Sequence, residues 1–221
     1  VAAAVLGWDL AAMLDASMAA AAGDPVLGSI AASNPGQGVL LVLWVAAVFL
    51  TILAHELGHA LVMRRYGIGS NIVLYHFGGL AIPDTAGASV RFGGYANPLQ
   101  QIAISAAGPI TQLLLAATII AGLRLSGSAI LLEVPLVHGL IPLSEGRQIP
   151  SLPIQAAVYF LLVPSILWAL MNLLPVFPLD GGQIARALFS IFSPRDGLRQ
   201  SLVLSFAVAT GVAIYSFTTQ D

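Results

Sequence analysis

Two histidines four positions apart, with a glutamate directly after the first, lie inside a long apolar stretch. His55, Glu56 and His59 are the ionisable residues of the segment 51–63. On an α-helix the two histidines would lie on one face, one turn apart, so both imidazoles could bind a single metal ion. Glu56 would lie at the edge of that face, where a carboxylate can take a proton from zinc-activated water without being a ligand. The spacing therefore predicts a metallopeptidase site.

The apolar surroundings of this motif strengthen the prediction. The pattern H-E-x-x-H is short enough to occur by chance, and the alternative is a buried polar cluster that only ties helices together. Ionisable groups inside a membrane cost several kcal/mol unless they have partners, so they usually mark function. A structural cluster would not need this spacing.

The composition is that of a membrane protein. Apolar residues make up 58% of the 221-residue chain and charged residues 8%, and the mean hydropathy is +0.92. These values predict an all-α polytopic membrane protein with about four to six transmembrane helices. The net charge of −2 argues against a nucleic-acid partner. Because the chain has no cysteine, histidine and carboxylate must hold any metal.

The hydropathy pattern divides the chain into an N-terminal apolar segment with a loop, a core that contains the predicted metalloprotease site and a C-terminal span, at residues 1–37, 38–192 and 193–221. The predicted spans are residues 38–63, 99–123, 154–174 and 198–217, with a short helix at 183–192. Residues 1–22 contain Asp9 and Asp15 and either cross the bilayer or lie in its interface.

Two other stretches have different expected structures. Residues 66–98 are rich in glycine and β-formers, which predicts a short β-hairpin or re-entrant element at the cytoplasmic side. In the loop 126–153, an apolar patch at 129–143 fits a short interfacial helix. His138 lies in the second stretch and is interpreted as a lone interfacial histidine, on the face opposite the proposed metal. His76 lies in the first stretch beside a glycine pair, where a single histidine is more often structural than a ligand; a ligand role is its alternative.

Arginines predict the orientation of the chain in the membrane. Arg64 and Arg65 directly follow the first confident span, which marks that end as cytoplasmic. The same topology places six of the eight arginines on the cytoplasmic side: Arg64, Arg65, Arg91, Arg186, Arg195 and Arg199. The active site of this multi-pass protein is therefore expected towards the cytoplasmic side.

A third candidate ligand lies far from the histidines in sequence. Asp180 follows Pro175 and Pro178, which cannot both continue an α-helix, so the backbone should open there. Asp180 could then turn inward, leaving a fourth tetrahedral position for water. The alternative is that Asp180 caps the helix predicted at 183–192.

Together these segments resemble the site-2 protease family of intramembrane zinc metalloproteases, from about residue 40 to residue 192. The resemblance is carried by four motifs: His55-Glu56-Leu57-Gly58-His59, Phe77-Gly78-Gly79, Ala107-Gly108-Pro109 and the stretch 172–182, N-L-L-P-V-F-P-L-D-G-G. The last of these is long and specific. Members often have an acidic residue where this chain has Gln100 and Gln101, which argues against a carboxylate role there.

The resemblance implies a three-span core in which His55, His59 and Asp180 hold Zn²⁺. Glu56 would act as general base and acid, and Asn172 would lie near the scissile carbonyl as an oxyanion donor. The alternative role for Asn172 is an interhelical hydrogen bond.

The predicted function is hydrolysis of peptide bonds in transmembrane segments of substrate proteins, that is, regulated intramembrane proteolysis. The expected partners are transmembrane protein substrates and the lipid bilayer. One alternative is a prenyl-protein peptidase, which would need a downstream glutamate ligand, yet Glu133 and Glu145 are expected on the opposite side. The other is a transporter or inactive scaffold that binds client helices.

A substrate helix must unwind before its backbone can reach a buried metal. The strand edges expected at 71–75 and 79–82 could pair with the opened substrate by β-augmentation. The alternative is a hairpin that merely plugs the cytoplasmic mouth of the site.

Overall fold

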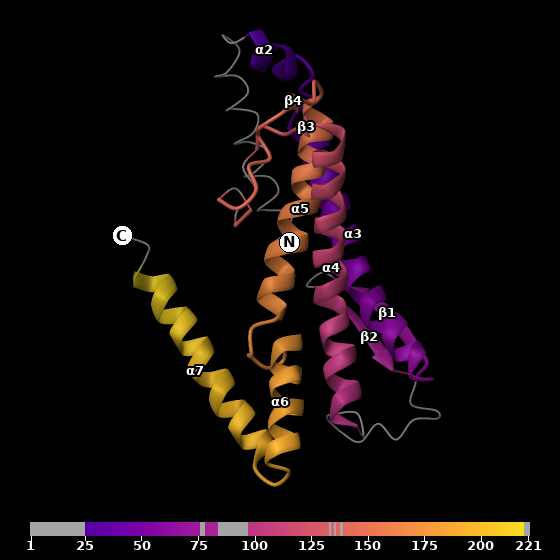
Figure 1. Cartoon of the computed structure of the whole chain (residues 1–221), viewed down its shortest axis with the longest axis vertical. Coiled ribbons are helices and arrows are strands. Elements are labelled where there is room, and N and C mark those ends of the chain that lie inside the picture. The colour runs from indigo at the N-terminus through magenta and orange to yellow at the C-terminus, as the bar shows by residue number, and fades with distance from the viewer. Residues whose placement is uncertain are drawn as a thin grey trace. The chain divides into compact units, whose positions relative to one another are not determined.

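The computed structural model describes residues 25–75, 78–83, 97–132, 134, 136–137 and 139–218. Four helices in this part of the chain are long and apolar enough to cross a membrane: α3 (Gln37–Arg65), α4 (Pro98–Ser126), α5 (Leu152–Asn172) and α7 (Gly197–Thr218) (Figure 1). Two shorter helices are α2 (Pro25–Ala31) and α6 (Asp180–Phe192). The prediction of an all-α polytopic membrane protein is confirmed, whereas the candidate span at 1–22 lies outside the described residues.

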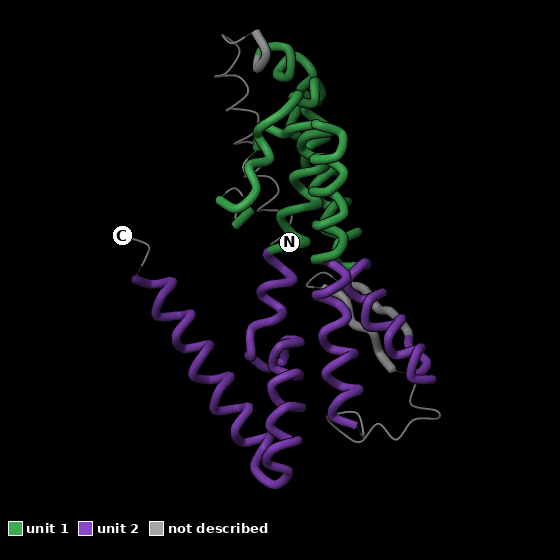
Figure 2. Tube along the Cα trace, viewed as in Figure 1, with its two compact units in different colours: residues 1–52, 113–166 green, residues 53–112, 167–221 purple. Residues whose placement is uncertain are grey.

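The chain forms two compact units, each made of two separate sequence segments (Figure 2). Unit 1 comprises residues 1–52 and 113–166, and unit 2 comprises residues 53–112 and 167–221. Every candidate site residue belongs to unit 2. The predicted division of the chain at residues 37 and 192 stays a prediction.

The core of unit 1 includes aromatic and aliphatic side chains of α3 and α5. Trp44 and Phe160 meet edge to face, with ring centroids 5.4 Å apart, and both are buried with Leu40, Ala47 and Ala156. Such burial removes apolar area from water or lipid and gives each side chain many dispersion contacts.

The loop between α4 and α5 differs from expectation. Its ends form a short parallel pair, β3 (Ser128–Ala129) with β4 (Arg147–Gln148), and the described residues between them form turns and bends. The predicted interfacial helix at 129–143 was therefore wrong for the described residues. Pro135 and Pro142 interrupt that stretch, and its apolar side chains Ile130, Val134 and Leu143 belong to the protein core instead.

A glycine ends α3 shortly after the histidines. Gly67 adopts φ +73°, a left-handed conformation that favours glycine. The N–H of Gly67 donates to the carbonyl of Arg64 and the N–H of Ile68 to that of Met63, both at 3.0 Å. With the contact between Met63 and Ile68, this is a Schellman motif. It fixes the cap of α3 just beyond Arg64 and Arg65.

The predicted hairpin follows. β1 (Ser70–Tyr75) pairs antiparallel with β2 (Gly78–Pro83), in a register that runs from Ser70 opposite Pro83 to Tyr75 opposite Gly78. The strand prediction is confirmed, while His76 lies outside the described residues. The helix α4 then begins with Asn97 as N-cap, whose Oδ1 accepts the N–H of Leu99 at 2.9 Å.

Candidate active site

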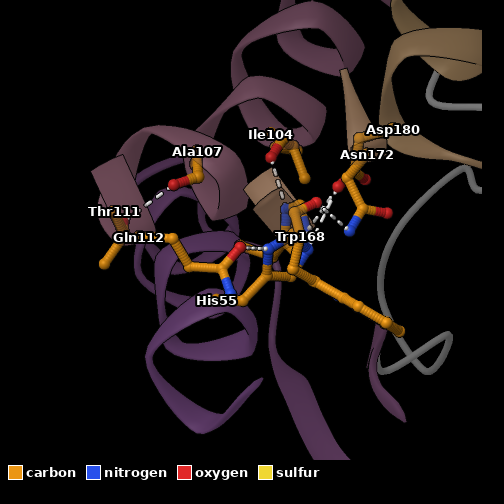
Figure 3. Close-up of polar contacts among 9 residues, drawn as sticks. His55, Ile104, Ala107, Thr111, Gln112, Trp168, Asn172 and Asp180 are labelled. Carbon is orange, nitrogen blue, oxygen red and sulfur yellow. Dashed lines mark hydrogen bonds and ion pairs between the residues drawn. The ribbon is translucent and has the colours of Figure 1, made fainter. Parts of the chain in front are cut away.

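The two histidines of α3 and the aspartate that opens α6 converge in unit 2 (Figure 3). Nε2 of His55 lies 3.0 Å from Nε2 of His59. Oδ2 of Asp180 lies 3.1 Å from the first of these nitrogens and 3.4 Å from the second. Folding thus closes a sequence gap of more than a hundred residues to form a group of three possible metal ligands.

These separations fit a tetrahedral zinc ion. Zinc binds imidazole nitrogen and carboxylate oxygen at about 2.0–2.1 Å, so two ligand atoms of a tetrahedral site lie about 3.3 Å apart. The three observed distances of 3.0, 3.1 and 3.4 Å are close to that value. In addition, Oδ2 of Asp180 is buried and has no hydrogen-bond partner among the described residues, which suits an atom that binds a cation.

The tautomers of both histidines agree with metal binding. Nδ1 of His55 lies 2.8 Å from Oε1 of Gln112, and Nδ1 of His59 lies 2.7 Å from the backbone oxygen of Ile104. Because a carbonyl oxygen only accepts a hydrogen bond, Nδ1 carries the proton in both rings and Nε2 presents its lone pair. Three electron-pair donors therefore face one another, an arrangement that a divalent cation stabilises.

One face of α4 supplies these partners. Positions 101, 104, 108 and 112 share a face of a helix with 3.6 residues per turn. Gln112 is fully buried at 0% exposure, and its amide oxygen faces His55 in Figure 3. At Gly108, an added Cβ would lie 2.7 Å from Nε2 of His55 and would also contact Nε2 of His59. Gly108 therefore leaves the space in which the metal-binding nitrogens meet.

A non-helical turn between α5 and α6 presents Asp180. The helix α5 ends at Asn172 and α6 begins at Asp180, as the prolines between them predict. An added Cβ at Gly182 would lie 2.6 Å from the backbone nitrogen of Phe177, and one at Gly181 would meet the backbone of Leu173. The two glycines thus let the first turn of α6 pack directly on the backbone of the preceding turn.

The helix-cap alternative for Asp180 does not match this geometry. The N-cap of α6 is Leu179, without a side-chain hydrogen bond, and Asp180 is already the first helical residue. Its carboxylate points to the histidines instead.

The environment keeps Asp180 ionised. Without metal, an imidazole can also carry a proton on Nε2. Burial by itself raises the pKa of the Asp180 carboxyl, but such protonated imidazoles of His55 and His59 outweigh burial and lower this pKa below its usual range. At neutral pH the residue is therefore a carboxylate, the form that binds metal.

The proposed base lies beside the histidines. Glu56 is buried at 5% exposure and directly follows His55 on α3. Glu56 is not part of the three-atom group formed by His55, His59 and Asp180. This position suits a carboxylate that handles protons next to a metal, although its catalytic role stays a prediction.

Asn172 lies at the C-terminal end of α5, near Asp180 in Figure 3. Its Nδ2 donates to the backbone oxygen of Trp168 at 3.0 Å, within the same helix. This bond uses one of the two amide protons of Asn172, and the proposed oxyanion contact would use the other. The donor role of Asn172 stays a prediction.

Sequence reasoning did not connect two buried glutamines with the metal site. Gln112 orients His55, and Gln101 donates through Nε2 to Oε1 of Gln183 at 2.9 Å, which joins α4 to α6 one turn beyond Asp180. The signal in the sequence was faint. The spacing of Gln101 and Gln112 by 11 residues places them on one helix face, and both are polar residues in an apolar span.

Two curated relatives carry the name "Putative zinc metalloprotease". One is Rip3 of Mycobacterium tuberculosis, 35% identical over 139 residues that cover 62% of this chain and 28% of Rip3. The other, from Synechocystis sp., is 33% identical over 142 residues that cover 64% of this chain and 30% of the relative. The chain thus spans less than a third of the length of these relatives.

A solved structure is also similar. The "Site-2 Protease from Methanocaldococcus jannaschii" aligns with 95% of this chain and 75% of its own, at 21% identity and a TM-score of 0.46.

The family comparison covers most of the chain. The names of the curated relatives and the group of His55, His59 and Asp180 support Zn²⁺ as the cofactor. The family model of Peptidase family M50 matches residues 43–215. The chain therefore belongs to peptidase family M50, the site-2 protease family that its motifs resemble.

Proposed function

We propose that this protein is an intramembrane zinc endopeptidase that hydrolyses peptide bonds in transmembrane segments of substrate proteins. The observation that carries the proposal is the convergence of His55, His59 and Asp180 on helices of a multi-pass membrane protein. Both histidines lie within α3, a helix long and apolar enough to cross a membrane.

The residues of the chain divide the chemistry among them. When bound, zinc supplies Lewis acidity to water and to the scissile carbonyl. Glu56 takes the proton of the attacking water and delivers it to the leaving amine. Asn172 donates its second amide proton to the developing oxyanion. Gln112 and the carbonyl of Ile104 hold the imidazoles in the tautomer that exposes Nε2.

The site is proposed to lie towards the cytoplasmic side of the membrane. Arg64 and Arg65 form the last turn of α3, and basic residues flank spans on the cytoplasmic side. His59 precedes Arg64 by little more than one helical turn. Substrates would be cut near that boundary.

A strand edge of the hairpin is proposed to receive the opened substrate. Exposing unwound backbone to lipid costs several kcal/mol unless its N–H and C=O groups form hydrogen bonds with other groups. The β1–β2 pair offers such groups on its outer edges. The alternative is a hairpin that only plugs the site. Such a hairpin would have the same strand edges, but cleavage would not depend on their hydrogen bonds.

Cleavage in a defined bilayer tests the function. The purified protein is reconstituted in liposomes with single-span substrates that carry a glycine or asparagine near the cytoplasmic end, and products are mapped by mass spectrometry. We expect cuts inside the span for the wild type and none for Glu56→Gln, with equal zinc content in both.

Two results would overturn the proposal. Glu56→Gln with wild-type activity would exclude the proposed base, and processing confined to prenylated peptides would favour the prenyl-protein peptidase. The ligand group found in the described residues contains Asp180 and no glutamate, which argues against the latter.

A further inference from the structure

A serine on α7 bonds the turn that presents Asp180. The N–H of Phe177 donates to Oγ of Ser205 at 3.0 Å, and the same hydroxyl donates to the backbone oxygen of Pro175 at 3.2 Å. A serine hydroxyl can serve as donor and acceptor at once. These two bonds join the turn to a helix 28 and 30 residues further along the chain.

The turn needs such a partner. Pro175 and Pro178 lack an N–H, and the segment between α5 and α6 leaves the regular helical hydrogen-bond pattern. In a membrane protein, backbone groups outside a helix cost several kcal/mol unless protein or water pairs with them. Ser205 satisfies one donor and one acceptor of this opened backbone.

The packing of α7 fixes where Ser205 lies. The buried residues of α7 are Gly197, Ser201 and Ser205, which repeat every four positions and so share one helix face. This face approaches α6 closely, because a Cβ at Gly197 would lie 2.7 Å from the backbone nitrogen of Ser190. In Figure 1, α6 lies between α7 and α4.

A short chain of contacts leads from Ser205 to the metal ligand. Ser205 holds the N–H of Phe177, and the nitrogen of Phe177 is 2.6 Å from where a Cβ on Gly182 would lie. Gly182 is in the first turn of α6, two residues after Asp180. A shift of the turn would therefore move the start of α6 and the Asp180 carboxylate with it.

We propose that Ser205 is a positioning residue of the metal site, whose hydroxyl holds the Pro175–Phe177 turn so that Asp180 meets His55 and His59. The C-terminal helix is thereby a working part of the site and not only an anchor in the membrane. The proposal rests on the metal site of the proposed function.

The test compares two serines of the same helix. Ser205→Ala removes the two bonds to the turn. Ser201→Ala is the matched control, because Ser201 is 4% exposed and Ser205 is 8% exposed. The Ser201 hydroxyl donates to the backbone oxygen of Leu198 in its own helix, at 2.8 Å. Zinc affinity is measured in detergent by competition with a chromogenic chelator, and the absorption of Co²⁺-loaded protein reports the ligand geometry.

We expect Ser205→Ala to weaken zinc binding about 10- to 100-fold, the range for residues that orient metal ligands, and to alter the Co²⁺ spectrum. Ser201→Ala should stay within about twofold of wild type, and Ser205→Thr, which keeps the hydroxyl, should bind more tightly than Ser205→Ala. If Ser205→Ala does not fold, zinc affinity is measured on Ser205→Cys instead. A thiol has a similar size but is a weak hydrogen-bonding group, so this variant should also bind zinc more weakly than wild type.

Wild-type affinity and spectrum in Ser205→Ala, or in Ser205→Cys where it is needed, would overturn the proposal, as would equal losses in Ser205→Ala and Ser201→Ala. Failure of the proposed function itself would look different, because wild-type protein would then bind no zinc, or would bind zinc without cleaving membrane spans, whatever the serine variants do.

Discussion

Gly108→Ala is the smallest change that should disturb the metal site. The new Cβ would lie 2.7 Å from Nε2 of His55 and would contact Nε2 of His59. Non-bonded carbon and nitrogen atoms rest at about 3.5 Å or more, so the methyl group is roughly 0.8 Å too close. The imidazoles must retreat from α4, away from the point where they meet Asp180.

The cost of this overlap can be estimated. Overpacking by a methyl group usually costs about 1–3 kcal/mol. If the free energy of zinc binding is weakened by that amount, zinc affinity falls about 5- to 150-fold. Helix propensity acts in the other direction, because alanine favours a helix over glycine by about 1 kcal/mol. Gly108→Ala should therefore lose zinc affinity without a matching loss of fold stability.

Gly122→Ala is the control, since Gly122 belongs to the same helix and its added Cβ would meet nothing within 4 Å. Zinc affinity and thermal unfolding are measured for both variants in the same detergent. Wild-type zinc affinity in Gly108→Ala would refute the placement of Gly108 against the Nε2 atoms. An equal loss of zinc affinity in both variants would mean that any added methyl group on α4 disturbs the site, whatever its distance from the histidines.

Three further predictions test other parts of the site. Gln112→Leu should weaken zinc binding about 10- to 100-fold, whereas Gln112→Glu, which still accepts from Nδ1 of His55, should retain it; equal affinities of the two variants would exclude an orienting role. Asp180→Ala should lose zinc and activity while Asp196→Ala, at an exposed carboxylate before α7, keeps both; full zinc retention in Asp180→Ala would remove that residue from the site. Single prolines along β1 should reduce cleavage at alternate positions, where N–H groups face the substrate; uniform tolerance, or activity that rises throughout, would favour a plug.

The parts of the site that follow from short spacing were predictable. His55 and His59 needed only helical geometry, because residues four apart on a helix must share a face. The opened turn before α6 followed from Pro175 and Pro178, since proline cannot donate the helical hydrogen bond. The β-hairpin followed from glycine and β-branched residues between two long apolar spans.

The parts that depend on long-range packing were not predictable from residues alone. Nothing in the local sequence of Gln112 names His55 as its partner, and Ser205 lies in a span whose apolar pattern suggests only a membrane anchor. The proline-opened turn made Asp180 a candidate ligand, but the sequence left the helix cap as an alternative, and the resemblance to a family favoured the metal. The error at 129–143 has a similar cause, because an apolar patch has the same composition whether it faces the membrane or a protein core.

X-ray absorption at the zinc edge of the purified protein tests the central claim most directly. The account predicts about one zinc per chain, with two imidazoles and oxygen ligands at about 2.0–2.2 Å and no sulfur shell at about 2.3 Å. In Asp180→Ala the imidazole signal should weaken with the loss of metal. Protein that binds no zinc, or zinc without two imidazoles in its first shell, would contradict the account.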